Sequence, residues 1–186
     1  MEQIEYEERV LIPEDIYLRI IEDAKKDGKP FSHIKIENVY LDNDERFIYK
    51  TKKMLRIRNI NGSFQELTLK IKNPDGSNRE INETLKCHPV IDKQLSNQFE
   101  TYHPTTKLLT DRIEVQYDEY LLVIDKNEYE DIIDFDIEIE AKSQQKALEV
   151  IQKYCGKYHL KYDENYHTKS HRAFKRMEEL KKKKGD

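Results

Sequence analysis

The sequence has little cysteine, no long hydrophobic run and no large excess of charge of either sign. Its two cysteines, Cys87 and Cys155, match neither the spacing of a metal site nor a disulfide framework, which is typical of a reducing compartment. The longest aliphatic run, residues 121–124, is far too short to span a bilayer. Residues 1–5 are acidic and lack the basic and apolar regions of a signal peptide. We therefore expect a cytoplasmic protein with no membrane partner.

Charged residues are abundant but nearly balanced. The chain has 33 lysines and arginines against 37 aspartates and glutamates, and charged residues make up 38% of it. Because nucleic-acid-binding domains usually carry a positive excess, this balance argues against a nucleic-acid partner. An anionic ligand would bind in a local pocket. The 186 residues suit one domain, which we expect to cover residues 1–180, with residues 181–186 as a disordered basic tail.

Alternation of apolar and polar residues predicts that much of the chain is β-sheet. The expected strands cover residues 4–11, 34–41, 55–60, 64–72, 79–85, 108–117, 120–124 and 134–141. Asn61-Gly62 adopts positive φ readily and therefore predicts a hairpin between two of these strands. Strands that follow one another after short turns indicate antiparallel pairing.

Helical spacing of apolar residues predicts four helices that could cover a sheet. Pro13 suits the first turn of the first helix, and Ser143 suits the N-cap of the third, which should end at Gly156. Residues 42–52 look like a loop or a short helical turn. The expected helices cover residues 13–27, 89–99, 143–156 and 170–180.

The predicted strands each have one apolar face and one charged face. In the first strand, Glu5, Glu7 and Arg9 share a face because side chains alternate along a strand. An open sheet with its charged face in water is the simplest explanation of such alternation. The other charged faces carry Arg56 and Arg58; Glu66, Lys70 and Lys72; Arg112 and Glu114; and Asp136, Glu138 and Glu140.

The signs of these charges differ from strand to strand. The first and last strands are rich in acids, whereas the strands between them carry the basic group. Since like charges within one strand repel, this segregation favours a ligand that combines a divalent cation with an extended anion. If the helices cover the apolar face of a strongly curved sheet, the charged face turns inward. Magnesium with a chain of phosphates would satisfy both signs.

The charged positions also belong to an ordered series of motifs. These are Glu5-Tyr6-Glu7-Glu8-Arg9, Tyr40-Leu41-Asp42, Leu55-Arg56-Ile57-Arg58, Glu66-Leu67-Thr68-Leu69-Lys70, Asp136-Ile137-Glu138-Ile139-Glu140 and Lys169-Ser170-His171-Arg172. In this order they resemble the CYTH domains, or triphosphate tunnel metalloenzymes, and more closely the family's uncharacterised bacterial branch. The first motif is similar to the family's Glu-x-Glu-x-Lys signature, and the last to its C-terminal Lys-x-x-Arg. The resemblance implies an α+β fold, a closed antiparallel β-barrel of about eight strands around a charged tunnel, with helices packed on the outside.

The resemblance also implies roles for individual side chains. Catalytic roles would fall to Glu5, Glu7 and Lys70, with Lys70 orienting the attacking water. Either Glu80 or Glu83 would be a further acid of the site. The divalent cation, Mg²⁺ or Mn²⁺, would be bound by Glu5, Glu7, Asp136, Glu138 and Glu140. Phosphate oxygens would be bound by Arg9, Arg56, Arg58, Lys70, Arg112, Lys169 and Arg172.

The chain departs from the family pattern at three positions. Arg9 replaces the signature lysine, which keeps the charge but rules out ready proton transfer from that side chain. Asp136 stands where glutamate is usual, and its shorter side chain reduces the reach to a metal. Thr110 stands where many members carry a second basic residue, which predicts a weaker phosphate contact from that strand.

The activity implied by the resemblance is that of a divalent-metal-dependent triphosphatase, an acid anhydride hydrolase. Its partner would be a triphosphate-containing small molecule, either inorganic triphosphate or a small organic triphosphate such as thiamine triphosphate. Two alternatives remain open: an adenylate-cyclase-type nucleotide cyclase, for which the sequence offers no recognisable purine site, and a non-catalytic sensor of polyphosphate or nucleotide. The sequence does not identify the physiological substrate or the metal, nor does it distinguish a monomer from a homodimer.

Overall fold

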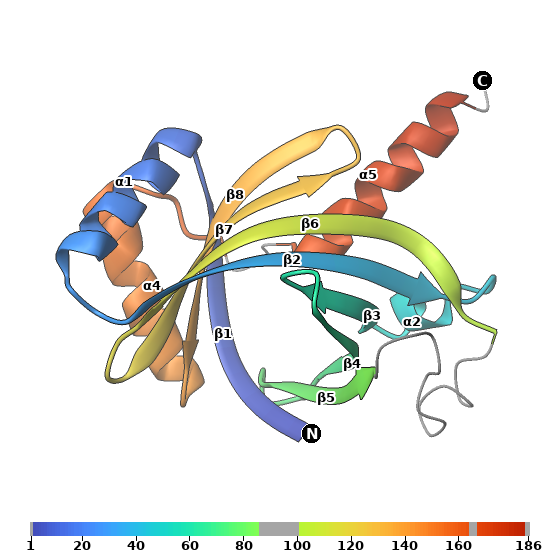
Figure 1. The fold of residues 1–186 in the computed structure, drawn as a ribbon, viewed down its shortest axis with the longest axis horizontal. Helices are drawn as coiled ribbons and strands as arrows, with labels where there is room; N and C mark the ends of the chain where they lie inside the picture. Colours follow the sequence, from blue (N-terminus) through green and yellow to red (C-terminus); the bar gives the residue numbers. More distant parts are fainter. Residues whose placement is uncertain (1, 86–100, 164–166, 185–186) are drawn as a thin grey trace.

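The computed structural model describes residues 2–85, 101–163 and 167–184 (Figure 1). The helix expected at residues 89–99 lies outside these ranges. The helices are α1 (Glu14–Lys26), α2 (Phe47–Lys50), α4 (Gln144–Tyr158) and α5 (Lys169–Lys184). The strands are β1 (Glu2–Ile12), β2 (Phe31–Asp42), β3 (Lys53–Ile60), β4 (Phe64–Lys72), β5 (Asn78–Leu85), β6 (His103–Gln116), β7 (Tyr120–Tyr129) and β8 (Ile132–Ala141).

The strands form one closed antiparallel barrel in the order β1-β5-β4-β3-β2-β6-β7-β8. Strand β1 closes it by pairing with two neighbours. Its residues Glu2 to Glu5 lie opposite β5, and Tyr6 to Ile12 lie opposite β8. The predicted closed barrel is therefore confirmed, and the alternative of an open sheet with a solvated charged face is wrong.

Two helices cover the outside of the barrel where β1, β7 and β8 meet. Figure 1 shows α1 and α4 side by side there, and Tyr158 Oη donates to Asp23 Oδ2 at 2.8 Å between them. Beneath them lie apolar side chains that point away from the tunnel, such as Ile137 and Ile139, which are fully buried. Burying these faces outside leaves the charged faces to point inward. No helix in the described ranges is long and apolar enough to cross a membrane.

Turn chemistry explains where several elements end. Asn61 and Gly62 have φ of 51° and 70° between β3 and β4, which confirms the predicted hairpin. The predicted end of α4 at Gly156 is wrong, because Gly156 lies inside the helix. His159 ends α4 in a left-handed conformation, and Leu160 N donates to Cys155 O at 2.9 Å. A glycine in a helix costs only about 1 kcal/mol relative to alanine, which burial of Cys155 and Tyr158 offsets.

Helix α5 also extends beyond its predicted end. It runs to Lys184, so residues 181–184, expected as a disordered tail, are helical. Lysine is a good helix former, and cations in the last turn interact favourably with the helix dipole. The prediction failed because it weighed the charge of this segment and not its helix propensity.

Candidate active site

The inward faces of the strands line a cavity of ≈ 1180 Å³. Both alternatives for the further acid, Glu80 and Glu83, line it, and so does Thr110. Asp136 and Arg172 lie outside this lining. The other predicted site residues line it: Glu5, Glu7, Arg9, Arg56, Arg58, Lys70, Arg112, Glu138, Glu140 and Lys169.

Lys70 lies between two carboxylates on one side of the cavity. Its Nζ is 2.9 Å from Glu7 Oε2 and 3.2 Å from Glu80 Oε1. Burial would lower the pKa of Lys70, but Glu7 and Glu80 outweigh it and raise that pKa. Glu80 is 5% exposed, and its Oε1 also lies 3.7 Å from Arg56 Nη2. Between Glu80 and Glu83, Glu80 is therefore the acid that contacts the basic side chains of the cavity. Lys70 therefore stays protonated and has a fixed position.

Arg9 connects β1 and β8, the two strands that are rich in acids. Its guanidinium contacts Glu7 on its own strand, and Nη1 lies 3.0 Å from Glu138 Oε1 on β8. Burial would raise the pKa of Glu7, but Arg9 and Lys70 lower it to about 2. Glu7 is therefore ionised throughout the physiological range.

Glu5, Glu7 and Glu140 form the first acidic group, with carboxylate oxygens within 4.8 Å of one another. Glu140 lies opposite Glu7 in the β1–β8 pair. Neither Glu5 nor Glu140 makes a side-chain hydrogen bond or ion pair within the described ranges. Burial, with neighbouring acids, raises the pKa of Glu140 to about 8 and also raises that of Glu5. Glu5 and Glu140 thus offer oxygen donors that no lysine or arginine pairs with in the described ranges, beside the paired carboxylate of Glu7, and such oxygen donors suit a hard divalent cation.

Asp125, Asp136 and Glu138 form the second acidic group, and all three are buried. Arg112 holds Asp125 with two contacts, Nε to Oδ1 at 3.0 Å and Nη2 to Oδ2 at 2.8 Å. Lys169 contacts all three acids, at 3.3 Å from Asp136 and 3.0 Å from Glu138. Since cations surround this group, we interpret it as an internal ion-pair network and not as a metal site.

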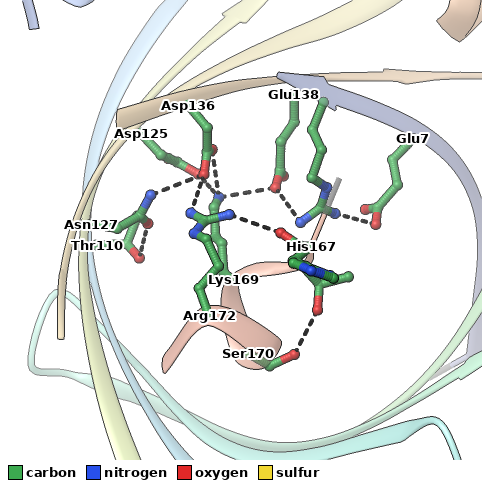
Figure 2. A network of polar contacts seen from close by, with 12 residues as sticks. Glu7, Thr110, Asp125, Asn127, Asp136, Glu138, His167, Lys169, Ser170 and Arg172 are labelled. Atoms are coloured by element: carbon green, nitrogen blue, oxygen red, sulfur yellow. Dashed lines mark hydrogen bonds and ion pairs between the residues drawn. The ribbon is translucent and has the colours of Figure 1, made fainter. Parts of the chain in front are cut away.

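This network holds the first turn of α5 inside the barrel. Figure 2 shows Lys169 and Arg172 reaching from α5 toward the acids of the surrounding strands. Arg172 donates to both oxygens of Asp134, at 2.8 and 2.9 Å, and to Asp136 at 2.8 Å. Asn127 completes the network by donating to Asp136 Oδ2 at 3.1 Å. Arg172, predicted to bind phosphate, therefore has its guanidinium directed at aspartates outside the cavity lining.

The sequence analysis missed Asp125, Asn127 and Asp134. The predicted strand at residues 120–124 stopped one residue before Asp125, whereas β7 continues to Tyr129. Had the alternation been extended, Asp125 and Asn127 would have fallen on the inward face with Val123. The sequence signal for these residues was Asp125 itself, a single acid that directly follows the aliphatic run at residues 121–124.

The raised pKa of Glu140 predicts a pH dependence of stability. Between about 4.5 and about 8 the folded protein keeps a proton on Glu140 that the unfolded chain has released. The free energy of unfolding should therefore fall as the pH rises through this window in the absence of metal. Glu140→Gln should lose this slope. Urea unfolding of the wild type and of Glu140→Gln at several pH values measures this slope, because the contributions of other titrating groups cancel when the two proteins are compared. Equal slopes in the two proteins would contradict the raised pKa of Glu140.

Solved structures with the same fold are known. A protein from Bacillus halodurans, provisionally named an adenylate cyclase, is 23% identical, with a TM-score of 0.79, over 93% of this chain and 98% of that chain. A Hippeastrum protein, provisionally named an adenylyl cyclase and described as having a dominant triphosphatase activity, is 14% identical, with a TM-score of 0.70, over 95% and 96%. The PH1819 protein of Pyrococcus horikoshii is 21% identical, with a TM-score of 0.62, over 94% and 98%. At these identities the likeness shows the fold alone.

Sequence comparison identifies the family. No curated protein matches the chain. The model of the CYTH domain, however, matches residues 3–171, which include all six motifs of the ordered series except its last residue, Arg172. The fold, the inward charged faces and this match agree, and the chain belongs to the CYTH domain family.

Proposed function

We propose that the protein is a divalent-metal-dependent triphosphatase, which hydrolyses the terminal phosphate of inorganic triphosphate or a small organic triphosphate within the barrel. One observation carries this proposal: the acidic group Glu5, Glu7 and Glu140 lines the same cavity as Arg56, Arg58 and Lys70. Glu5 and Glu140, which have no ion pair within the described ranges, suit a bound cation, and the basic side chains suit a polyanion. A metal-bound triphosphate provides both.

The first acidic group has the donors that a Mg²⁺ or Mn²⁺ site needs. Its three side chains offer only oxygen, the donor type preferred by these cations, and the raised pKa of Glu140 reflects a burial cost that a bound cation would remove. We therefore assign metal binding to Glu5, Glu7 and Glu140. A bound divalent cation would neutralise phosphate oxygens and acidify a water molecule. Glu138 and Asp136, the remaining predicted ligands, belong to the ion-pair network.

Arg56 and Arg58 are the best candidates for contacting phosphate. Their ion pairs are long, at 3.7 Å from Arg56 to Glu80 and 3.4 Å from Arg58 to Glu66. Arg56 is 8% exposed, and its Nε has no hydrogen-bond partner within the described ranges. A phosphate oxygen would satisfy that donor, and the planar guanidinium suits paired phosphate oxygens. Arg9, Arg112 and Lys169 are more closely paired, so their contribution is mainly the positive field around the substrate.

The chemistry requires positioning and charge neutralisation more than covalent participation by the protein. The oxygen of a water molecule attacks the terminal phosphorus, the bond from that phosphorus to the bridging oxygen breaks, and the shortened chain leaves with that oxygen. Lys70 orients the water or a phosphate oxygen through its ammonium protons, because Glu7 and Glu80 fix its Nζ. Arg56 and Arg58 compensate the charge that develops on the leaving oxygen.

Phosphate release from inorganic triphosphate, ATP and thiamine triphosphate, with Mg²⁺ or Mn²⁺, tests this function. Release of orthophosphate is expected. Formation of pyrophosphate and a cyclic nucleotide from ATP would instead support the cyclase alternative, which the provisional names of two similar structures favour as second candidate. Binding of triphosphate without turnover would leave the sensor alternative.

Metal should stabilise the protein, and the gain should depend on the first acidic group. At a Mn²⁺ concentration of about 100 times Kd, the free energy of unfolding should rise by about 2.7 kcal/mol. Glu140→Gln should reduce this gain. Thermal unfolding with and without Mn²⁺ measures this gain in stability. Glu37→Gln is the control, because Glu37 pairs with Lys107 on the surface. An unchanged gain in Glu140→Gln would contradict the assignment of this ligand.

A further inference from the structure

A smaller cavity lies outside the barrel, between α5 and the hairpin of β7 and β8. Figure 1 shows α5 passing beside this hairpin, and Arg176 of the helix donates to both carboxylate oxygens of Asp131 in the turn, at 2.6 and 2.5 Å. The cavity has a volume of ≈ 300 Å³, at the lower end of the range for small-molecule pockets. We call it the α5 groove, and its lining includes Tyr129, Ile132, His167, His171, Lys175 and Arg176.

The acids that border the α5 groove are already paired. Each of these four acids contacts an arginine: Asp131 and Glu179 contact Arg176, Asp134 contacts Arg172, and Glu178 contacts Arg46. The two arginines that line the groove, Arg172 and Arg176, are thereby held in place. None of the four acids is left to neutralise a further base.

Three bases of the α5 groove have no such partner. His167, His171 and Lys175 follow one another at intervals of four residues, which places them along one side of the helix. The rings of the two histidines are stacked, with their centres 4.3 Å apart and their planes inclined by 25°. Within the described ranges, the side chains of all three make no hydrogen bond and no ion pair. Their nitrogen atoms are therefore available to a ligand.

The charges around the two histidines favour an anion. Burial, His167 and Lys175 lower the pKa of His171, and Glu178 opposes them only in part. Since two imidazolium ions at this separation repel each other strongly, at least one ring is neutral in the free protein. An anion in contact with both rings and with Lys175 would remove the repulsion and favour protonation. Binding of the anion and uptake of a proton would then strengthen each other.

A metal ion, the other usual ligand of paired histidines, fits the α5 groove less well. The described residues offer no third histidine, cysteine or carboxylate whose ligand atom lies close to both rings. The ammonium group of Lys175 would also repel a cation. A tetrahedral oxyanion, in contrast, accepts hydrogen bonds from two imidazolium rings and an ammonium group.

We propose that the α5 groove is a binding site for a phosphate group, which His167, His171 and Lys175 hold together and which binds with uptake of a proton. The site is separate from the cavity inside the barrel, because that cavity is lined by His171 but by neither His167 nor Lys175. A bound phosphate group would fix the segment that enters α5, next to Lys169 of the ion-pair network. The inference is independent of the proposed function.

NMR of the histidine rings in the full chain tests the site, with sulfate as the first probe. The ring signals of His167 and His171 should move together and saturate as sulfate replaces chloride at constant ionic strength. His167 is the decisive reporter, because it does not line the cavity inside the barrel, where sulfate could also bind. Sulfate keeps its charge near neutral pH, so a pH dependence belongs to the protein. Affinity should be about tenfold higher at about pH 6 than at about pH 8, because uptake of about half a proton has this effect over that interval.

Matched variants separate the α5 groove from the cavity inside the barrel. Lys175→Gln should weaken the binding of sulfate at His167 by about fivefold, the upper end for an exposed charge pair. Arg58→Gln removes a cation of the cavity inside the barrel and should leave binding at His167 unchanged. Lys181→Gln removes an exposed cation farther along α5 and should also leave it unchanged.

Other results would overturn the inference. These are a His167 signal that does not saturate, a loss of binding in Arg58→Gln but not in Lys175→Gln, and equal affinity at both pH values. Orthophosphate and glycerol phosphate are then compared as competitors of sulfate at His167. Stronger competition by orthophosphate supports the free ion as ligand, and stronger competition by the ester supports a small phosphorylated molecule in contact with Tyr129 and Ile132. If neither displaces sulfate, the assignment to a phosphate group is wrong.

Discussion

Glu5→Gln should lower phosphate release by roughly 10³-fold without destabilising the protein. Charge stabilisation by a bound metal contributes several kcal/mol to phosphoryl transfer, and each 1.36 kcal/mol corresponds to a factor of ten in rate. Glu5 makes no ion pair within the described ranges, and burial raises its pKa. Removing its charge therefore breaks no internal contact. Activity should fall while the melting temperature stays the same or rises.

Two comparisons sharpen this test. Glu37→Gln removes a carboxylate that pairs with Lys107 on the outer surface and should retain full activity. Glu7→Gln should also inactivate the protein but with some loss of stability, because Glu7 contacts both Arg9 and Lys70. Phosphate release and thermal unfolding are measured on all three proteins. Wild-type turnover in Glu5→Gln would remove this residue from the metal site.

Asp125→Ala should destabilise the fold by about 3 kcal/mol, the largest stability effect we expect. Asp125 is fully buried and contacts both Arg112 and Lys169. Removing one partner of a buried ion pair costs about 3–5 kcal/mol because it leaves uncompensated charge. Glu138 still pairs with both cations, which keeps the cost near the lower end of that range. Urea unfolding measures the effect as a lower midpoint with an unchanged slope.

The matched control is an aspartate on the surface. Asp118 lies 3.4 Å from Lys29, and its side chain is 90% exposed. Exposed pairs contribute only about 0–1 kcal/mol, so Asp118→Ala should shift the midpoint little. Should the two variants have equal stability, the buried network would not be what holds α5 in place. Loss of α5 alone would appear as a separate transition at lower urea concentration.

Alternation along the strands predicted a sheet with one apolar and one charged face, and the resemblance to the CYTH domains predicted that this sheet closes into a barrel. The apolar face of the sheet, which includes Ile137 and Ile139 on the strand next to β1, is buried under helices. The opposite face of β1, with Glu5, Glu7 and Arg9, therefore points inward. Such a pattern is local and can be read residue by residue. The ends of α4 and α5 were predicted wrongly because tertiary packing and helix propensity outweighed a single glycine and a run of charge.

The candidate site was harder to predict in detail than the fold. Alternation tells which face a side chain occupies, but not which strands its neighbours come from. It could not reveal that Glu140 lies near Glu5 and Glu7, whereas Asp136, four residues away on the same face, lies beside Lys169 and Arg172. Those groupings depend on strand register and on the entry of α5 into the barrel, which are tertiary facts.

The divided pairing of β1 has a consequence for biosynthesis. Glu7 lies opposite Glu140, so the carboxylates assigned to the metal are brought together only after nearly all of the barrel has emerged from the ribosome. Contacts between such distant parts of a chain form late and slowly. Until then β1 has an unpaired edge open to foreign strands. We expect nascent chains to depend on chaperones during this interval, and the proposed metal site to form only after the barrel has closed.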